Sequence, residues 1–404
     1  MANVSLLSNN NYIQTPYIKV VIGDYEFGVY NKNAKGLDKY PNFVKELTVT
    51  KINGQVNTYT LSLNYQITEY DDPNYFEKVL SSVSSSRKIV FTYGDMSLPT
   101  FVYKNEEAII TKVTSNVNIT NSSISYTIDA VSQGNLLSVG SYNFPARCNT
   151  KPSTVIYELL RSNQYGLKDL FSGMRNENLI RTNNLIPTTD CKVDIKQKVN
   201  TSILEYLQYL VSIMTPSKDV NYVSTNSVYI MTFQDDTSGI YNGSYFKITQ
   251  IDSAISHPEA YELDIGYPSS NLVTSFEINQ NENYSIYYEY QKKLNDGTTV
   301  SRYNKYGVEE EVYAPVLSSK NSHFETDQED INWWSKVTQY PIKASITIMG
   351  LIRPAVLMSY LRLNTYFYGN KHISSGLWII TKQQDKISGS GFYTTLDMVK
   401  VSGD

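Results

Sequence analysis

The sequence is poor in the residues that carry most enzyme chemistry. Its 404 residues include 2 cysteines and 3 histidines, and 18% of them are charged, against about 25% in typical soluble domains. Cys148 and Cys191 are too few for a disulfide framework or a four-cysteine zinc site. One bridge between them and two unrelated thiols are the alternatives, and we favour two thiols in a reducing compartment.

The sequence also lacks a strong charge of either sign and a long hydrophobic run. The net charge of −4 and the pI of about 5.6 exclude a generic nucleic-acid-binding protein, which would be basic. No stretch approaches the ~18 apolar residues of a transmembrane helix. Residues 1–8 have no basic region followed by an apolar core, so we expect no secretory signal and no membrane insertion.

Motifs for catalysis and for metal or nucleotide binding are missing as well. His257, His323 and His372 lie far apart, and none has a second histidine or a cysteine at ligand spacing. Acidic pairs such as Asp235 and Asp236 have too few ligands for a calcium loop. No glycine-rich phosphate loop follows a strand. We therefore predict a protein that is not an enzyme, with no catalytic, cofactor-binding or metal residues and no cofactor.

Tyrosine and asparagine are abundant instead. The chain has 35 Tyr and 37 Asn, and 13% of its residues are aromatic. Tyrosine suits half-buried strands and interfaces, and asparagine suits turns. The aromatic content argues against disorder, so the composition favours a β-rich fold.

The N-terminal third is predicted to be β-rich, with alternating patterns typical of half-buried antiparallel strands. Asn53 and Gly54 lie between two β-prone runs and predict a tight type I′ hairpin turn. The remaining predicted elements are strands at 17–22, 25–30, 45–52, 56–67, 88–93, 100–103, 107–114 and 123–132, with one short helix at 75–84.

The middle of the chain has a different pattern. Apolar residues at helical spacing predict helices over 152–171 and 201–214, with β patterns following at 221–233 and 243–251. β patterns then dominate from residue 272, with closing strands at 344–349, 360–368, 378–382 and 391–401. Residues 295–315 are polar, charged and loop-like.

Two distant segments repeat each other. Each reads IITK followed by T-[IL]-D-x-V, and each is predicted to be a hairpin, with a turn near 118–122 in the first and 388–391 in the second. Chance similarity of two short hairpins is the alternative to duplication. The repeated residues are the candidate subunit-interface positions: Ile109, Ile110, Thr111, Lys112, Thr127, Asp129 and Val131 in the first copy, and Ile379, Ile380, Thr381, Lys382, Thr395, Asp397 and Val399 in the second.

These patterns predict a mainly β fold with an α+β portion. The expected domains are a first antiparallel β-barrel at 1–140, an inserted α+β domain at 141–265 and a second, related β-barrel at 266–404 with a polar insertion near 295–340. Three subunits with two copies each would form a ring with pseudo-six-fold symmetry. The face of each strand that would line the ring stays open, because a shift of one residue exchanges the two faces.

The two ends of the chain resemble a known family. Residues 369–382, which include a Ser-Gly-Leu-Trp-Ile-Ile run, and residues 391–396 are similar to the closing strands of tail hub proteins of long-tailed phages. Pro41-Asn42 and Tyr93-Gly94-Asp95 are compatible with the first barrel of the same family. The family comprises the baseplate hub at the end of the tail tube and the tube-like part of type VI secretion spikes.

The resemblance implies a structural virion protein of the tail baseplate, made in the host cytoplasm. Such hubs are homotrimers of tail-tube-like domains that connect a hexameric tail tube to a trimeric spike. The implied partners are further copies of the chain, the tail tube protein, the spike or tip protein, other baseplate proteins and the tape measure protein. DNA would pass through the channel without specific binding, which the low charge favours because phosphate affinity scales with lysine and arginine contacts.

Two other classes of protein remain as alternatives. A tail-associated carbohydrate- or receptor-binding protein would use Trp333, Trp334 and Trp378 to stack on sugars. A hydrolase that degrades the cell wall would need two converging carboxylates, and no pair stands out.

Overall fold

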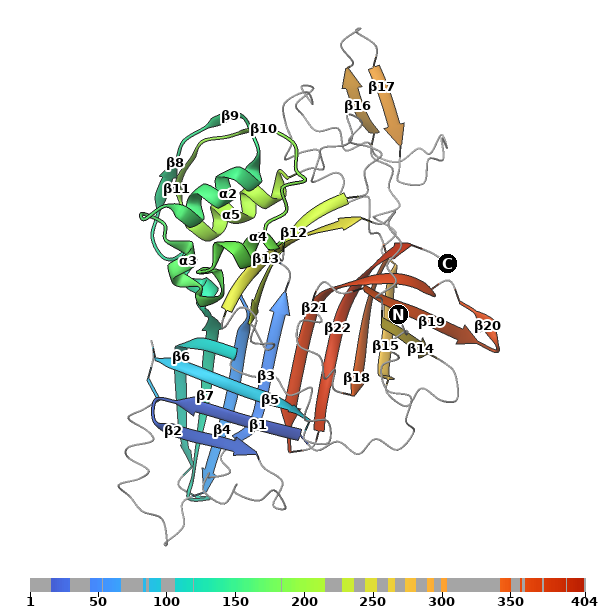
Figure 1. The fold of residues 1–404 in the computed structure, drawn as a ribbon. Helices are drawn as coiled ribbons and strands as arrows, with labels where there is room; N and C mark the ends of the chain where they lie inside the picture. The colour runs from blue at the N-terminus through green and yellow to red at the C-terminus, as the bar shows by residue number, and fades with distance from the viewer. Residues whose placement is uncertain are drawn as a thin grey trace.

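Strands predominate in the structure, a computed structural model (Figure 1). It describes residues 16–29, 44–52, 54–66, 83–84, 87–95, 106–118, 120–182, 184–214, 227–235, 244–252, 261–265, 273–280, 289–293, 299–303, 342–349, 357, 360–372, 374–389 and 391–402. The helices of these residues all lie between Gln133 and Ser212. The predicted mainly β fold with an α+β portion is therefore confirmed at this level.

Within the described residues, 14 strands form one large sheet. Along its main path the order is β15-β18-β22-β21-β3-β4-β7-β6-β5-β1-β2, and β19, β14 and β20 branch from β21. Every pairing is antiparallel except that of β14 with β19. The two central strands, β3 (Val44–Ile52) and β21 (Gly376–Ser388), come from opposite ends of the chain. We call their junction the seam.

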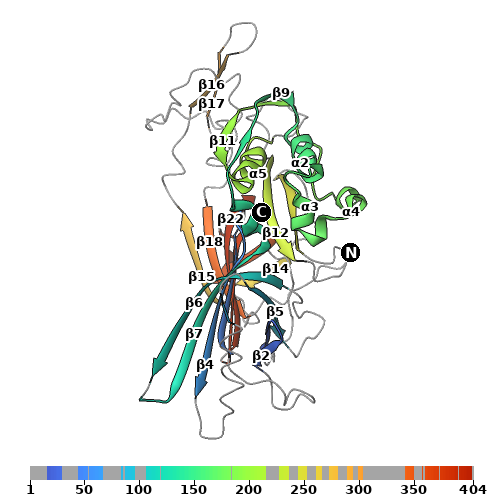
Figure 2. The same ribbon diagram turned by 90° about the vertical axis from the view of Figure 1, so that its left-hand side faces the viewer.

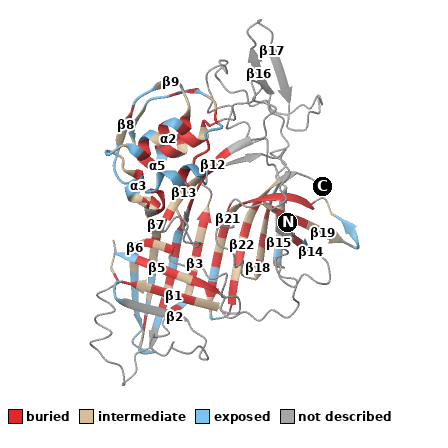
Figure 3. Ribbon diagram, viewed as in Figure 1, coloured by how far each residue is buried: buried red, intermediate tan, exposed pale blue. Residues whose placement is uncertain are grey.

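The first half of the sheet lies on one side of the seam. Its further strands are β4 (Thr58–Gln66), β7 (Ser123–Ser132), β6 (Glu106–Asn118), β5 (Lys88–Asp95), β1 (Pro16–Ile22) and β2 (Tyr25–Val29). Burial alternates along β1, β4, β5 and the first part of β6 (Figure 3), because successive side chains point to opposite faces. β1, β2 and β5 cross one face of β6, β7 and β4 (Figures 1 and 2), and apolar residues of both layers form one core cluster.

The second half repeats this plan on the other side of the seam. Its strands are β22 (Gly391–Ser402), β18 (Ile342–Met349), β15 (Val273–Gln280), β19 (Tyr360–Phe367), β14 (Tyr261–Ile265) and β20 (Asn370–Lys371). Leu361 and Leu363 of β19 pack with Ile346, Trp378 and Leu396 in a separate cluster.

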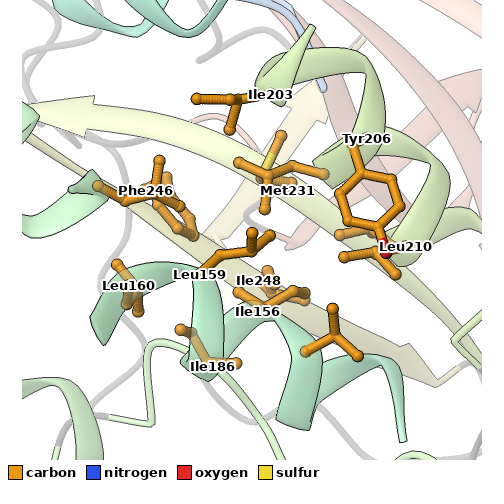
Figure 4. Packing of buried hydrophobic residues seen from close by; sticks show 14 of the residues in the cluster. Ile156, Leu159, Leu160, Ile186, Ile203, Tyr206, Leu210, Met231, Phe246 and Ile248 are labelled. Atoms are coloured by element: carbon orange, nitrogen blue, oxygen red, sulfur yellow. The ribbon is translucent and has the colours of Figure 1, made fainter. Parts of the chain in front are cut away.

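A helical unit lies at one end of the sheet (Figures 1 and 2). Its elements are η2 (Gln133–Ser138), β8 (Tyr142–Phe144), β9 (Arg147–Thr150), α2 (Pro152–Arg161), α3 (Leu167–Leu170), η3 (Ser172–Met174), α4 (Glu177–Thr182), β10 (Val193–Ile195), β11 (Lys198–Thr201), α5 (Ile203–Ser212), β12 (Ser227–Asp235) and β13 (Ser244–Asp252). Ile156 and Leu159 of α2 pack against Leu210 of α5 and against Met231 and Phe246 of β12 and β13 (Figure 4).

The single helix predicted over residues 152–171 is wrong in its length. α2 ends at Arg161, and α3 begins separately at Leu167. The backbone N–H groups of Tyr165 and Gly166 both donate to the Ser162 carbonyl, and Gly166 has the left-handed φ of 36°. Glycine adopts this φ without steric cost, so the apolar positions of the pattern belong to two helices.

The hairpin predicted around Asn53 and Gly54 forms, but its loop is longer than the predicted two-residue turn. The last paired residues of β3 and β4 are Thr50 and Thr58. A turn does close at the predicted place, because the Gln55 N–H donates to the Ile52 carbonyl at 3.1 Å and Gly54 has a φ of 71°. The N–H of Gly54 also donates to the Met231 carbonyl at 2.8 Å, and the Gln208 amide donates to the Gly54 carbonyl at 2.7 Å, so the β3–β4 loop binds the helical unit.

A short hairpin occupies part of the predicted polar insertion. β16 (Glu289–Lys293) pairs with β17 (Thr299–Tyr303), so the loop predicted from residue 295 is wrong for 299–303, where Thr299, Val300 and Tyr303 favour a strand. The predictions at 75–82, 100–103 and 304–341, together with Pro41, Asn42, His257 and His323, lie outside the described residues. No helix of the described ranges is long and apolar enough to cross a membrane.

Candidate functional site

The two repeated hairpins have the same geometry. In β6 and β7, Ile109 pairs with Val131 and Lys112 with Asp129, and the register shifts around Thr111. In β21 and β22, Ile379 pairs with Val399 and Lys382 with Asp397, and the register shifts around Thr381. Such a bulge places one extra residue opposite its partner strand. Identical residues thus carry an identical irregularity, which favours duplication over chance.

The threonine at each bulge makes the same hydrogen bond. The Thr111 hydroxyl donates to the Asp129 carbonyl at 3.1 Å, and the Thr381 hydroxyl donates to the Asp397 carbonyl at 3.1 Å. The carboxylate of each aspartate also accepts a hydrogen bond from a hydroxyl group on the next strand of the sheet. Thr60 of β4 donates to Asp129 at 3.0 Å, and Ser345 of β18 donates to Asp397 at 2.9 Å.

The equivalence extends one strand further. β3 pairs with β4 with a register shift between Val44 and Glu46, and β15 pairs with β18 with a shift between Val273 and Ser275. The strand order β3-β4-β7-β6 therefore corresponds to β15-β18-β22-β21. The repeat found in two strands of sequence covers four strands in each half.

One face of these eight strands carries mainly hydroxyl, amide and charged side chains. We call it the open face, because it lies opposite the buried core positions. Two of its lysines lie beside carboxylates: Lys382 is 3.3 Å from Asp397, and Lys386 is 3.2 Å from Glu46 across the seam. The central part of the open face consists of Thr48, Thr50, Thr60, Ser62, Asn64, Lys112, Thr114, Asn116, Ser125, Thr127, Asp129, Lys343, Ser345, Thr347, Lys382, Gln384, Lys386, Thr395 and Asp397.

At the end near the helical unit, apolar residues cover part of this face in the second half. Ile230 of β12 and Leu357 pack against Ile379, and Val399 lies beside them. The repeated residues therefore divide between roles. Ile110 and Ile380 are buried in the cores, while Lys112, Thr127, Lys382 and Thr395 lie on the open face.

The core side of the seam contains a buried polar network that the sequence analysis missed. Lys51 of β3 donates to Glu106 of β6 at 2.6 Å, and the Tyr93 hydroxyl donates to the same carboxylate oxygen at 3.0 Å. On β21, Asp385 is fully buried and accepts hydrogen bonds from Thr394 at 2.6 Å and Gln383 at 2.7 Å. The sequence signals the burial of Gln383 and Asp385 only by their spacing. They lie two and four positions before the buried Ile387, so they face the same side of the strand.

Burial changes the acidity of this network. Desolvation raises the pKa of Asp385 to about 7, although the hydrogen bonds from Thr394 and Gln383 and the charge of Lys51 act in the opposite direction. Tyr93 also contacts Phe392 of β22 edge to face, with ring centroids 6.4 Å apart. The end of β5, in the first half, therefore crosses the seam and contacts β22 of the second half.

Both outer strands of the eight-strand set have an edge with no partner strand among the described residues. Beyond Ile109, β6 pairs only with β7, and β15 pairs only with β18. Val117 on the β6 edge is 60% exposed, whereas Ile387 at the equivalent position of β21 is completely buried against the first half. The edge of β6 thus corresponds to the edge of β21. β21 pairs there with β3, whereas β6 has no pairing strand there among the described residues.

Other candidates from the sequence have local roles. Trp378, a candidate for sugar stacking, is fully buried and donates its indole N–H to the Ser374 carbonyl at 3.1 Å. His372 bonds Ser374 within its own turn. Cys148 and Cys191 form no disulfide, and across the described ranges no three His, Cys, Asp or Glu residues are placed to hold a metal ion.

Solved structures of phage tail proteins share this fold. The 43 kDa tail protein of prophage MuSo2 from Shewanella oneidensis matches with a TM-score of 0.55 and 9% identity, over 96% of this chain and 97% of that one. A tail protein from Neisseria meningitidis MC58 matches with a TM-score of 0.50 and 9% identity, over 95% and 96% of the two chains. A component of the type VI secretion system of E. coli gives a TM-score of 0.47 and 10% identity, over 91% and 76%.

The chain therefore has the fold of phage tail proteins over nearly its whole length. The resemblance predicted from its terminal segments is confirmed at the level of the fold. No model of a protein family matches the sequence, and no curated protein does.

Proposed function

We propose that this chain is a structural protein of a phage tail, the baseplate hub at the distal end of the tail tube. Three copies close into a ring in which each contributes both halves of its sheet, so that six similar units surround a central channel. The observation that carries this proposal is the pair of edges, on β6 and β15, that have no partner strand among the described residues. They are the equivalents of β21 and β3, which already pair with each other inside the chain.

The intrachain seam supplies the register of the proposed contact between subunits. Ile387 pairs with Leu47 at the seam. By the equivalence of the halves, Val117 of one subunit pairs with Phe276 of the next. Phe276 is only partly buried against its own core, so this pairing covers two apolar side chains. It also satisfies the backbone groups of two sheet edges, which otherwise invite aggregation.

The open face is the proposed lining of the channel. Its side chains are mainly neutral, and its lysines at Lys382 and Lys386 lie beside carboxylates. A lysine that is already paired with a carboxylate neutralises phosphates less well, so fewer counterions leave the DNA and binding is weaker. DNA then passes through the channel without being retained by it.

The two ends of the ring differ, and this supports a role as a symmetry adaptor. At one end, each half presents a short hairpin, β6–β7 or β21–β22, which gives six similar loops for a hexameric tail tube protein. At the other end, the first half carries the helical unit and the second half carries the connection that includes β16 and β17 (Figure 1). Three copies of this unlike pair suit a trimeric spike or tip protein. Tape measure and other baseplate proteins are further proposed partners.

The domain division follows the same plan. Residues 1–140 and 266–404 are the two tube-like β-barrels of the proposal, and residues 141–265 are the inserted α+β domain. Three core clusters support a division into three units, with Leu137 of η2 in the core of the helical unit and Leu263 of β14 in that of the second half. Closure of each half into a barrel is part of the proposal.

The mass of the purified protein in solution tests the proposal. Light scattering is expected to give about 138 kDa, three times the chain mass of 46.0 kDa. Val117→Lys is expected to give monomers, because it places a charge in the β6–β15 contact. Val139→Lys is the matched control, since Val139 is 63% exposed but lies outside the sheet edges. A trimer that Val117→Lys leaves intact contradicts the β6–β15 contact, and a wild-type protein that is monomeric at every concentration contradicts self-assembly.

A further inference from the structure

The hairpin between β19 and β20 ends in a fully exposed tyrosine. Tyr368 and Gly369 form its two-residue turn, with φ values of 50° and 81°. A bulky residue such as tyrosine is uncommon at positive φ, and holding it there lowers the folding stability. The hairpin also projects past β15, beyond the edge of the sheet (Figure 1). Neither folding stability nor packing within the described part of the chain accounts for a tyrosine at this position.

The internal repeat predicts which surface the β19–β20 hairpin contacts. β5 pairs with β6 through Lys88 and Ile109, and β19 pairs with β21 through Tyr360 and Ile379. Because Ile109 and Ile379 are equivalent, β5 and β19 are equivalent crossing strands. The far end of β5 passes over the seam, where Tyr93 contacts Phe392 of the other half. The far end of β19 must then pass over the proposed contact between subunits.

The landing surface follows from the same equivalence. Phe392 and Ile387 lie under the end of β5 and belong to the core cluster of the first half. Their equivalents in the first half are Ile124 of β7 and Val117 of β6. Ile124 is 8% exposed and Val117 is 60% exposed, and neither is part of a core cluster of the described residues.

We propose that the β19–β20 hairpin is a clamp between subunits, in which Tyr368 docks on the exposed Val117 of a second copy of this chain, next to the buried Ile124. The inference rests on the proposed trimer. Pairing of β6 with β15 joins the subunits through one layer of the sheet, and the clamp joins them through the crossing layer. Large aromatic side chains in such contacts dominate binding energy, which explains why a tyrosine is kept in a strained turn.

Photo-crosslinking tests the position of the clamp. A benzophenone amino acid replaces Tyr368 in the full chain, and the oligomer is irradiated and digested with trypsin. The expected product joins residue 368 of one subunit to the tryptic peptide 113–147 of another, which contains Val117 and Ile124. The same amino acid at Val199, which is 56% exposed and lies outside that peptide, is expected to give no crosslink to it. A trimer with no crosslink there overturns the clamp but leaves the proposed function standing, and a protein that forms no trimer overturns both.

Tyr368→Asn separates binding from folding. Asparagine tolerates the left-handed region better than tyrosine, so the variant is expected to unfold at the same temperature as the wild type or higher. Loss of the ring is expected to raise the concentration at which trimers dissociate by about tenfold, the typical effect of removing one aromatic contact residue. A variant that assembles as tightly as wild type, or that loses assembly only because it unfolds, contradicts the clamp. Val139→Ala is the control for assembly.

Discussion

The hydroxyl of Thr394 donates a 2.6 Å hydrogen bond to the carboxylate of Asp385, and no part of Asp385 is exposed to solvent. The pair lies on the core side of the seam, on the two strands of one repeated hairpin. The equivalent positions of the first half are Ser115 and Tyr126, which are exposed and half-buried. The two halves are thus alike in backbone register and unlike in the chemistry of their seams. The buried polar pair of the seam therefore has no counterpart at the equivalent positions of the first half.

Asp385 makes the stability of the protein depend on pH. Its pKa is raised by burial to about 7 in the folded chain, against about 3.9 in an unfolded one. The folded state therefore binds the proton more tightly. The stabilisation from this group is complete below about pH 4 and is lost as the pH rises through about 7.

Asp385→Asn is expected to remove this dependence. An asparagine accepts from Thr394 and, with the Gln383 amide turned over, donates to Gln383. Between pH 4 and 7 the unfolding free energy of the wild type is expected to fall relative to the variant, by at most ~1.4 kcal/mol per pH unit. Urea unfolding at several pH values measures the difference. Parallel pH profiles for the two proteins contradict the prediction.

Gly134 is expected to tolerate no side chain. A Cβ atom at this position would lie 2.8 Å from Cδ1 of Phe233 and 3.0 Å from Cγ1 of Val56. Both neighbours pack in or against the core of the helical unit, so Gly134→Ala is expected to lower the unfolding free energy by about 1–3 kcal/mol. Gly389→Ala is the matched control, because nothing lies within 4 Å of its Cβ position. Equal unfolding free energies for the two variants would show that η2 does not pack as described.

The start of α5 depends on Ser202. Its hydroxyl accepts from the Glu205 backbone N–H at 3.2 Å, and its own backbone N–H donates to the Glu205 carboxylate at 2.9 Å. This reciprocal pair satisfies two donors at the helix end, and the bond from Ser202 lowers the pKa of Glu205. Ser202→Ala is expected to cost about 1 kcal/mol in a thermal or urea unfolding experiment. The exposed Ser141 serves as the control, since Ser141→Ala is expected to cost little.

The two threonines at the bulges, Thr111 and Thr381, are expected to contribute equally to the unfolding free energy. Thr111→Val and Thr381→Val each remove a 3.1 Å hydrogen bond to an aspartate carbonyl and keep the shape of the side chain. Each is expected to lower the unfolding free energy by about 0.5–1.5 kcal/mol. The double variant is expected to lose the sum of the two, because the sites lie in different halves. A large loss from only one of them would mean that the bulges are similar in backbone but not in energy.

Much of the local structure was predictable from the sequence. Period-two alternation located β3, β4 and β7, because burial of one sheet face determines the spacing of apolar residues. The repeat of IITK and T-[IL]-D-x-V located the two equivalent hairpins, because the same residues meet the same demands of a bulged strand pair. The approximate position of α5 also followed from its apolar stripe.

The tertiary structure decided the rest. The pairing of β3 with β21 joins residues more than 300 positions apart, and neither strand carries a local signal for the other. The β3–β4 loop binds the helical unit, because Gly54 bonds Met231 and Gln208, and no local pattern indicates these distant partners. The burial of Asp385 and the continuous open face exist only once the two halves meet at the seam. Sequence by itself determines the strands and their repetition, because these depend on neighbouring residues, whereas the seam and the surfaces around it depend on which distant strands come together.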